Sequence, residues 1–191
     1  MQTINSILAL FYREYKLTFR TFYDVLTIIL FFLLGIFILV FSIGPNNEIF
    51  NQIGAGIIWT LLLLSTNLSI KRFYQDDFND DNIFLLHMSG LSFEFIVIIK
   101  LIAFWFFFQL PFVFIIPIAC LILEIGTENI YLILITFLLG SPILTSLASI
   151  SGSMNLLNNR SFAIGSVIVM ILSIPFIIFS VGIINAPLEF V

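Results

Sequence analysis

The sequence predicts an all-α fold, a polytopic transmembrane helical bundle, and composition and hydropathy carry that prediction. Of the 191 residues, 61% are hydrophobic and only 9% are charged, whereas about a quarter of the residues in a typical soluble domain are charged. The mean hydropathy is +1.19, and so few charged side chains cannot cover a water-exposed surface. Long apolar stretches also recur along the whole chain. We therefore expect one membrane domain over residues 1–191.

Before the first apolar stretch, residues 1–22 are expected to form an interfacial amphipathic helix. Apolar residues recur at helical spacing, at Ile4, Ile7, Leu8, Phe11, Tyr15, Phe19 and Phe22. Arg13, Lys16 and Arg20 share the other side. Such a helix lies along a membrane surface, with its basic side chains among the headgroups. The alternative is a polar lead-in to the first span, which the helical periodicity disfavours.

Five apolar stretches have the length of a membrane crossing. A hydrocarbon core of about 30 Å needs roughly 20 helical residues, and we expect spans at about 25–43, 53–70, 95–123, 130–150 and 162–184. The third stretch contains Pro111 and Pro117, which predict a kinked or tilted helix. Lys100 lies inside that stretch, and its long stem is expected to extend the ammonium back to the headgroups.

The basic residues predict the orientation of the chain. Short cytoplasmic loops retain Lys and Arg, whereas translocated loops shed them. All seven basic residues fall on one side of the predicted topology: Arg13, Lys16, Arg20, Lys71, Arg72, Lys100 and Arg160. The N-terminus is therefore expected in the cytoplasm and, after five spans, the C-terminus outside. Nucleic acid is not an expected partner, because no basic face is available to neutralise phosphates.

The longest polar stretch, residues 71–92, interleaves aspartates with large apolar residues. On a helix, Asp76, Asp77, Asp80 and Asp81 would form like-charge pairs four residues apart, which is unfavourable without a cationic partner or a metal. The intervening aromatics favour a segment that docks into a partner. One alternative is a solvated acidic loop with its aromatics on the membrane surface. Another is the Mg²⁺ site of a membrane transferase, although no second acidic cluster accompanies it.

Residues that could carry chemistry elsewhere are sparse. The sequence contains no Walker-type phosphate-binding motif, and Cys120 and His87 have no neighbours at metal-ligand spacing. We therefore expect no catalytic residue, no metal site and no directly bound cofactor. Ion-driven transporters place ionisable groups near the membrane midplane, and these spans do not, so a partner ATPase is the expected energy source. Gln109 and Asn67 are expected to form hydrogen bonds between helices.

Five short sequences, taken in order, resemble one known family. They are FYREYKLTFR at 11–20, FSIGP at 41–45, GIIW at 56–59, the segment from Arg72 through Asp76 and Asp77 to Leu86, and LLGSP at 138–142. Their order and spacing, over essentially the whole chain, resemble the CcmB family. That family provides the membrane permease subunit of the ABC-type haem exporter in cytochrome c maturation.

The resemblance implies a permease subunit that pairs with a cytoplasmic ABC ATPase. With other cytochrome c maturation membrane proteins, it would support haem delivery to a periplasmic haem chaperone, with haem as the substrate and ATP bound by the partner subunit. Residues 71–92 would be a cytoplasmic coupling segment, and residues 1–22 would be the elbow helix. The chain would form a homodimer in the bacterial inner membrane. The ATPase contact would be made by Phe73, Asp76, Asp77, Asp80 and Leu85.

The alternative within the same class is a permease subunit of another ABC exporter, for a drug, a lipid or a polysaccharide. Two features depart from the family pattern. A Gly and a Glu that are usual in the family are missing from residues 81–84. The family has six spans, whereas the sequence contains five apolar stretches, so we expect a truncated chain whose sixth span would follow Val191.

Overall fold

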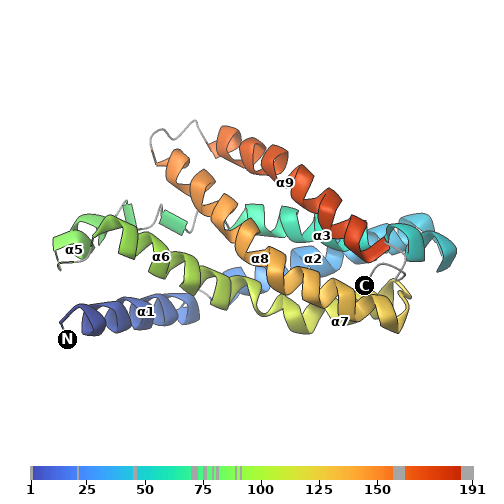
Figure 1. The fold of residues 1–191 in the computed structure, drawn as a ribbon, viewed down its shortest axis with the longest axis horizontal. Coiled ribbons are helices and arrows are strands. Elements are labelled where there is room, and N and C mark those ends of the chain that lie inside the picture. The colour runs from blue at the N-terminus through green and yellow to red at the C-terminus, as the bar shows by residue number, and fades with distance from the viewer. Residues whose placement is uncertain are drawn as a thin grey trace.

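The computed structural model describes residues 2–20, 22–44, 47–69, 73–74, 77–78, 80, 82–88, 90, 92–156 and 162–185. In this part of the chain, helices follow one another with short connections (Figure 1). They are α1 (Gln2–Arg20), α2 (Phe22–Ile43), α3 (Asn47–Leu68), α5 (Asn82–Met88), α6 (Phe93–Phe104), the π-helix η1 (Trp105–Gln109), α7 (Phe112–Ile122), α8 (Thr127–Asn155) and α9 (Phe162–Asn185).

Five spans are present, as the sequence predicts. Among the described residues, five helical stretches are long and apolar enough to cross a membrane: Phe22–Ile43, Glu48–Leu68, Phe93–Ile122, Thr127–Met154 and Gly165–Ile184. Each coincides with a predicted span and differs from it only at the ends. A helix satisfies all its backbone hydrogen bonds internally, which is why apolar stretches of this length adopt it in lipid. The all-α polytopic class is therefore confirmed.

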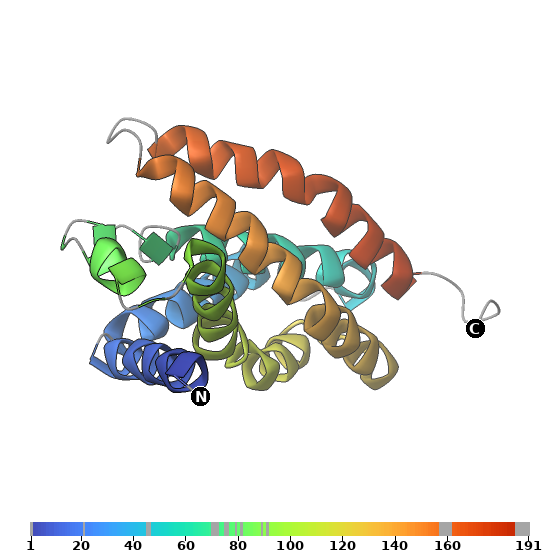
Figure 2. The ribbon, with the colours of Figure 1, turned by 60° about the vertical axis from the view of Figure 1, so that its left-hand side comes forward.

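The third span is kinked at η1, as its prolines predict. The backbone N–H of Leu110 donates to the carbonyl of Trp105, five residues earlier, at 3.0 Å. Pro111 follows directly and has no N–H with which to continue the α-helical ladder. Figure 2 shows the change in direction between α6 and α7. Pro117, in contrast, lies inside α7, so the break coincides with Pro111 alone.

Helix α3 lies at the centre of the bundle and packs against α2, α8 and α9 (Figure 1). Its Trp59 is fully buried, with ring centroids 6.4 Å from Phe137 of α8 and 5.1 Å from Phe176 of α9. Gly140 of α8 makes this close approach possible. A Cβ at that position would overlap the Phe176 ring and lie 2.8 Å from Cη2 of Trp59.

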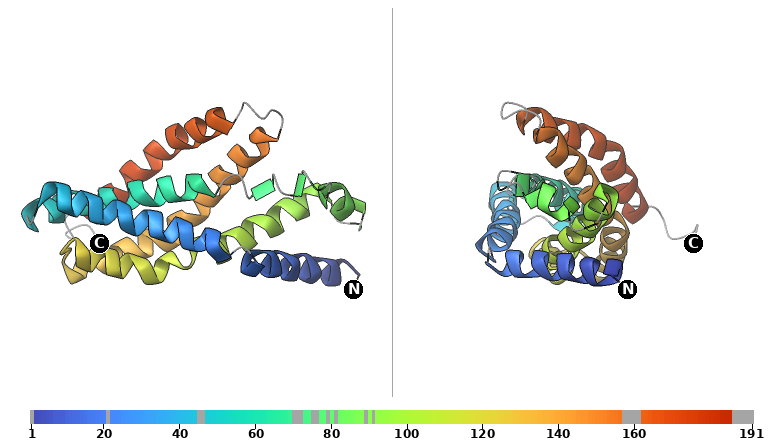
Figure 3. Two further views of the ribbon diagram at one scale, coloured as in Figure 1. Left: turned by 180° about the vertical axis from the view of Figure 1, so that it is seen from behind. Right: turned by 90° about the vertical axis from the view of Figure 1, so that its left-hand side faces the viewer.

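Helix α1 packs beside α6 (Figure 3), and the helix predicted before the first span is therefore present. Its Leu10 is buried against Ile96 and Ile99 of α6. Sequence periodicity placed Leu8 on the apolar side, yet Leu8 is 63% exposed and Leu10 takes the packed position. The periodicity therefore identified the helix and much of its contact face, since Ile7 and Phe11 pack against the same group, whereas Leu8 does not.

The described basic side chains belong to elements at one end of the bundle. One end carries α5, α1, the end of α8 and the start of α9, and the other carries the end of α2, the start of α3 and the α7–α8 connection (Figures 1 and 3). The described basic residues belong to elements at the α5 end: Arg13, Lys16 and Lys100. Acidic residues begin α3 and flank the start of α8 at the other end: Glu48, Glu124 and Glu128.

Candidate functional site

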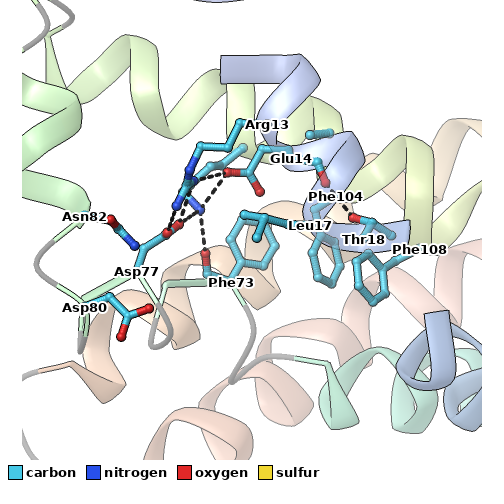
Figure 4. A pocket seen from close by; sticks show the side chains of 12 residues that line it. Arg13, Glu14, Leu17, Thr18, Phe73, Asp77, Asp80, Asn82, Phe104 and Phe108 are labelled. Carbon is cyan, nitrogen blue, oxygen red and sulfur yellow. Dashed lines mark hydrogen bonds and ion pairs between the residues drawn. The ribbon is translucent and has the colours of Figure 1, made fainter. Parts of the chain in front are cut away.

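Four side chains of acidic and basic residues, from three parts of the chain, meet where the 71–92 segment packs against the bundle. We call Arg13, Glu14, Asp77 and Lys100 the ion-pair cluster. Arg13 and Lys100 pair with different carboxylate oxygens of Asp77. Glu14 Oε1 lies 2.9 Å from Nη1 of Arg13 and 3.3 Å from Nζ of Lys100. Figure 4 shows Arg13 and Glu14 of α1 facing Asp77. The cluster thus connects α1, the 71–92 segment and α6.

Lys100 does not reach the headgroups, so that prediction was wrong. It is 4% exposed and Asp77 is 7% exposed, and the Lys100 ammonium also donates to the carbonyl of Phe73 at 3.4 Å. Burying an unpaired charge is costly, whereas two cations and two carboxylates in contact balance one another. The ammonium turns inward because Asp77, 23 residues earlier in the chain, provides a closer partner than a headgroup.

The neighbouring cations determine the protonation of Asp77. Burial alone would raise the pKa of its carboxyl, but the hydrogen bond from Arg13 and the charge of Lys100 outweigh burial, and the pKa falls below its ordinary value of 3.8. Burial likewise acts to lower the pKa of Arg13, and the hydrogen bond to Asp77 reverses that effect and raises it. The Asp77–Arg13 pair is therefore fully ionised at neutral pH.

The lowered pKa of Asp77 predicts a specific pH dependence of stability. A carboxyl whose pKa is lower in the folded state stabilises the fold above its unfolded pKa, and this contribution is lost as the pH falls through the folded pKa. We expect the wild-type protein to melt at a higher temperature than Asp77→Asn throughout the range above pH 3.8. Below that pH the difference should shrink, and it should disappear once the pH has fallen through the lower pKa of the folded state. Thermal unfolding of both proteins in detergent, measured across this range, checks the prediction, and a difference that grows on acidification would contradict it.

Aromatic contacts attach the 71–92 segment to the bundle beside the ion-pair cluster. The Phe73 ring stacks on Phe104 of α6 with centroids 4.4 Å apart, and Phe104 stacks on Phe108 at 4.5 Å. The Tyr74 hydroxyl lies 2.7 Å from Oγ of Ser149 in α8. These contacts bury both Phe73 and Tyr74. Phe73 and Tyr74 are thus held against the bundle by side chains of α6 and α8.

A small cavity of about 130 Å³ adjoins the ion-pair cluster. Its lining combines the four charged side chains with the rings of Phe104 and Phe108, and Asp80 and Asn82 also line it (Figure 4). Binding sites for drug-sized molecules measure about 300–1,000 Å³. The cavity therefore has room for a few water molecules or one side chain, and it is too small for a transported substrate.

The residues predicted to contact a partner divide into buried and exposed groups. Phe73 and Asp77 are buried, whereas Asp80 and Leu85 are exposed, Leu85 by 62%. Asp76 lies outside the described residues. The expectation that these aspartates need a cationic partner is met for Asp77, which has two. Lys100, on the other hand, was not identified from the sequence as its partner.

The basic residues predicted to lie at the membrane interface also differ in their surroundings. Lys16 is exposed on α1, whereas Arg13 is half-buried in the ion-pair cluster. Arg20 ends α1, but its side chain lies outside the described residues. His87, considered as a ligand, stacks on Phe93 with ring centroids 4.1 Å apart.

Two polar contacts join the middle of the third span to its neighbours. Gln109 donates from Nε2 to Oγ1 of Thr66 at 2.8 Å, as predicted for an interhelical bond. Trp105 donates from Nε1 to Oγ of Ser141 at 2.8 Å. For Asn67 the prediction was wrong within the described part of the chain, where its buried amide has no hydrogen-bond partner. Both ends of η1 are therefore held by the helices around it.

The fold and the site together define a class: a polytopic α-helical membrane protein with an amphipathic N-terminal helix and a charged segment between its second and third spans. Comparison with known proteins narrows this class. The family model described as CcmB protein matches residues 5–189. The chain belongs to the CcmB family.

Similar proteins named heme exporter protein B come from several bacteria. The chain is 30% identical to that of Haemophilus influenzae over 174 residues, which cover 91% of this chain and 79% of the relative. It is 26% identical to the protein of Pseudomonas aeruginosa over 185 residues, 97% of this chain and 83% of the relative. It is 28% identical to the protein of Bradyrhizobium diazoefficiens over 179 residues, 94% and 81% respectively.

Proposed function

We propose that this chain is the permease subunit of an ABC-type haem exporter that supports cytochrome c maturation. Membership of the CcmB family carries the proposal, together with relatives that are named heme exporter protein B. The chain supplies membrane spans and no catalytic residues. ATP is hydrolysed by a cytoplasmic partner ATPase, and other cytochrome c maturation membrane proteins and a haem chaperone complete the assembly.

The proposed location is the bacterial inner membrane, with the N-terminus in the cytoplasm. The described basic residues of α1 and α6 belong to the α5 end of the bundle, whereas Glu48 in the first turn of α3 and Glu124 and Glu128 around the start of α8 belong to the other end. This asymmetry supports a cytoplasmic α5 end by the positive-inside rule. On α1, the exposed Lys16 is available for headgroups, and Arg13 and Arg20 are proposed to contribute to the same interface.

The 71–92 segment is the proposed coupling segment for the ATPase. Asp80 and Leu85 are exposed and offer a mixed charged and apolar contact. Phe73 and Asp77 face inward and act by holding the segment against α6. Asp76 is proposed to join the ATPase contact. Two copies of the chain, as a homodimer, would present two such segments to two ATPase subunits.

The sequence leaves two alternative functions, a permease for another substrate and a Mg²⁺-dependent transferase. Different observations bear on each. A permease for a drug, lipid or polysaccharide shares this fold and partner class, and the names of the relatives favour haem over those substrates. A Mg²⁺-dependent transferase needs free aspartate oxygens. Both carboxylate oxygens of Asp77 pair with Arg13 and Lys100, and this arrangement disfavours a metal site at that residue.

The proposal predicts that an ATPase copurifies with the tagged protein from native membranes in mild detergent. We expect Asp80→Lys to reduce the recovered ATPase about tenfold, because a reversed charge in a contact costs more than a kilocalorie per mole. Glu128→Lys is the matched control, since Glu128 is also exposed but begins α8 at the other end of the bundle. Recovery should match the wild type in that control.

Mass spectrometry of the copurified proteins tests each part of the proposal. Haem-handling membrane proteins beside the ATPase support the haem exporter. An ATPase accompanied by other membrane partners would transfer the assignment to another substrate. If no ATPase is recovered with the wild type, the permease function itself is wrong.

A further inference from the structure

Lys100 is the residue at which three separate elements meet. Its ammonium pairs with Asp77 of the coupling segment and lies 3.3 Å from Oε1 of Glu14 on α1. It also donates to the carbonyl of Phe73 at 3.4 Å. An ammonium has three N–H donors, and Lys100 directs its donors to two elements that are far from α6 in sequence. One buried side chain of α6 therefore holds both neighbouring elements.

Apolar contacts reinforce the same three elements. Phe73 stacks on Phe104 of α6 at 4.4 Å, and Leu10 of α1 is buried against Ile96 and Ile99 of α6. Leu86 of α5 packs against this second group as well. Closely packed side chains transmit displacement with little compression. Helix α1, the coupling segment and α6 are thus joined on the same side of η1.

The π-helix η1 separates these elements from the rest of the third span. Its last hydrogen bond spans five residues, from Leu110 to Trp105, and Pro111 interrupts the ladder immediately afterwards. The interhelical bonds of Trp105 and Gln109 hold η1 against α8 and α3. A π-helix within an α-helix frequently marks a functional site. Here it lies where the third span changes direction between α6 and α7 (Figure 2).

We propose that Lys100 is a positioning residue that makes α1, the coupling segment and α6 one rigid lever, with η1 as its hinge. The proposal rests on the proposed function, because the partner ATPase supplies the force on the coupling segment. Lys100 acts through Asp77 and Glu14 and contacts neither the ATPase nor the substrate. Displacement of the coupling segment therefore moves α1 and α6 together and changes the angle between α6 and α7.

The test compares Lys100→Met with Lys16→Met. Each variant removes one lysine charge and inserts the same side chain, but Lys16 is exposed on α1 whereas Lys100 is buried. Methionine fills the space of the lysine stem, and Asp77 keeps its pair with Arg13. Spin labels are attached at the exposed positions Leu8 of α1, Phe95 of α6 and Leu121 of α7, after the single cysteine, Cys120, is replaced by alanine.

In the isolated protein, the distance distribution between the labels on α1 and α6 should be narrow for the wild type and for Lys16→Met. Lys100→Met should lose the narrow distribution, and Lys100→Arg, which keeps the charge, should retain it. A distribution for Lys100→Met as narrow as that for Lys16→Met would overturn the proposal. This measurement needs no partner, so its outcome does not depend on whether the proposed function is correct.

In the complex with the ATPase, a non-hydrolysable ATP analogue should shift the distance between α6 and α7 while leaving the distance between α1 and α6 unchanged. Lys100→Met should retain the ATPase and its hydrolysis but lose the shift between α6 and α7. A shift between α1 and α6 in the wild type would overturn the rigid lever. Absence of any ATPase from the wild-type preparation would instead overturn the proposed function.

Discussion

Replacing Asp77 by alanine is expected to cause a large loss of stability. Removing one partner from a buried ion pair costs about 3–5 kcal/mol, because the opposite charge is left without compensation. Here two cations, Arg13 and Lys100, would share the single carboxylate of Glu14. The free energy of unfolding in detergent, measured by titration with sodium dodecyl sulfate, should fall by about 3 kcal/mol.

The matched control for Asp77→Ala is Asp80→Ala. Asp80 lies three residues further along the same segment and is exposed, and substitutions at exposed positions typically change stability by less than about 0.5 kcal/mol. Comparing the two variants therefore distinguishes the loss of a buried, paired carboxylate from the loss of a negative charge alone. Equal losses for the two variants would show that the ion-pair cluster does not stabilise the fold. We also expect Asp77→Ala to weaken recovery of the proposed ATPase, because the 71–92 segment then loses its pairs with both Arg13 of α1 and Lys100 of α6.

Replacing Gly140 by alanine is expected to cost about 1–3 kcal/mol, the usual range for overpacking a tightly packed core. The new Cβ would overlap the ring of Phe176 and approach Trp59 within 2.8 Å. Trp59 cannot turn aside, because it is fully buried and also packs on Phe137. Helices α3, α8 and α9 would have to separate. The same titration with sodium dodecyl sulfate should show the loss of stability.

Gly182→Ala provides the control for the glycine substitution. Gly182 lies in α9, and a Cβ there would meet no atom within 4 Å. In a helix interior, alanine is favoured over glycine by up to about 1 kcal/mol. The two substitutions should therefore have opposite signs, with Gly182→Ala neutral or stabilising. A similar loss at both positions would contradict the packing argument and indicate a general intolerance of added volume.

The spans could be predicted from the sequence because lipid imposes a local requirement. Each crossing needs about 20 apolar residues, and this requirement is visible in a stretch such as 162–184 without reference to any other part of the chain. The kink at Pro111 is equally local, since a missing N–H interrupts the helix wherever it occurs. The amphipathic helix before the first span follows in the same way from its periodicity.

The candidate site could be predicted only in part. Four closely spaced aspartates indicated that the 71–92 segment needs cations, and the structure provides two for Asp77. The sequence did not indicate which cations, because Arg13 and Lys100 are distant in the chain and each had a plausible role at the membrane surface. The prediction for Lys100 was wrong for this reason. A lysine within a span can extend to the headgroups or pair with a buried carboxylate. Which of the two occurs at Lys100 depends on how α6 packs against its neighbours.

The sequence by itself determined the class of protein, the positions of its five spans and the distinct character of the 71–92 segment. These properties follow from composition and periodicity, which act over a few helical turns. Only the tertiary structure decided that α1, the 71–92 segment and α6 share the buried ion-pair cluster, and that Gly140 brings three helices together at Trp59. Such contacts depend on which helix faces pack together, and that choice reflects side-chain complementarity across the whole bundle.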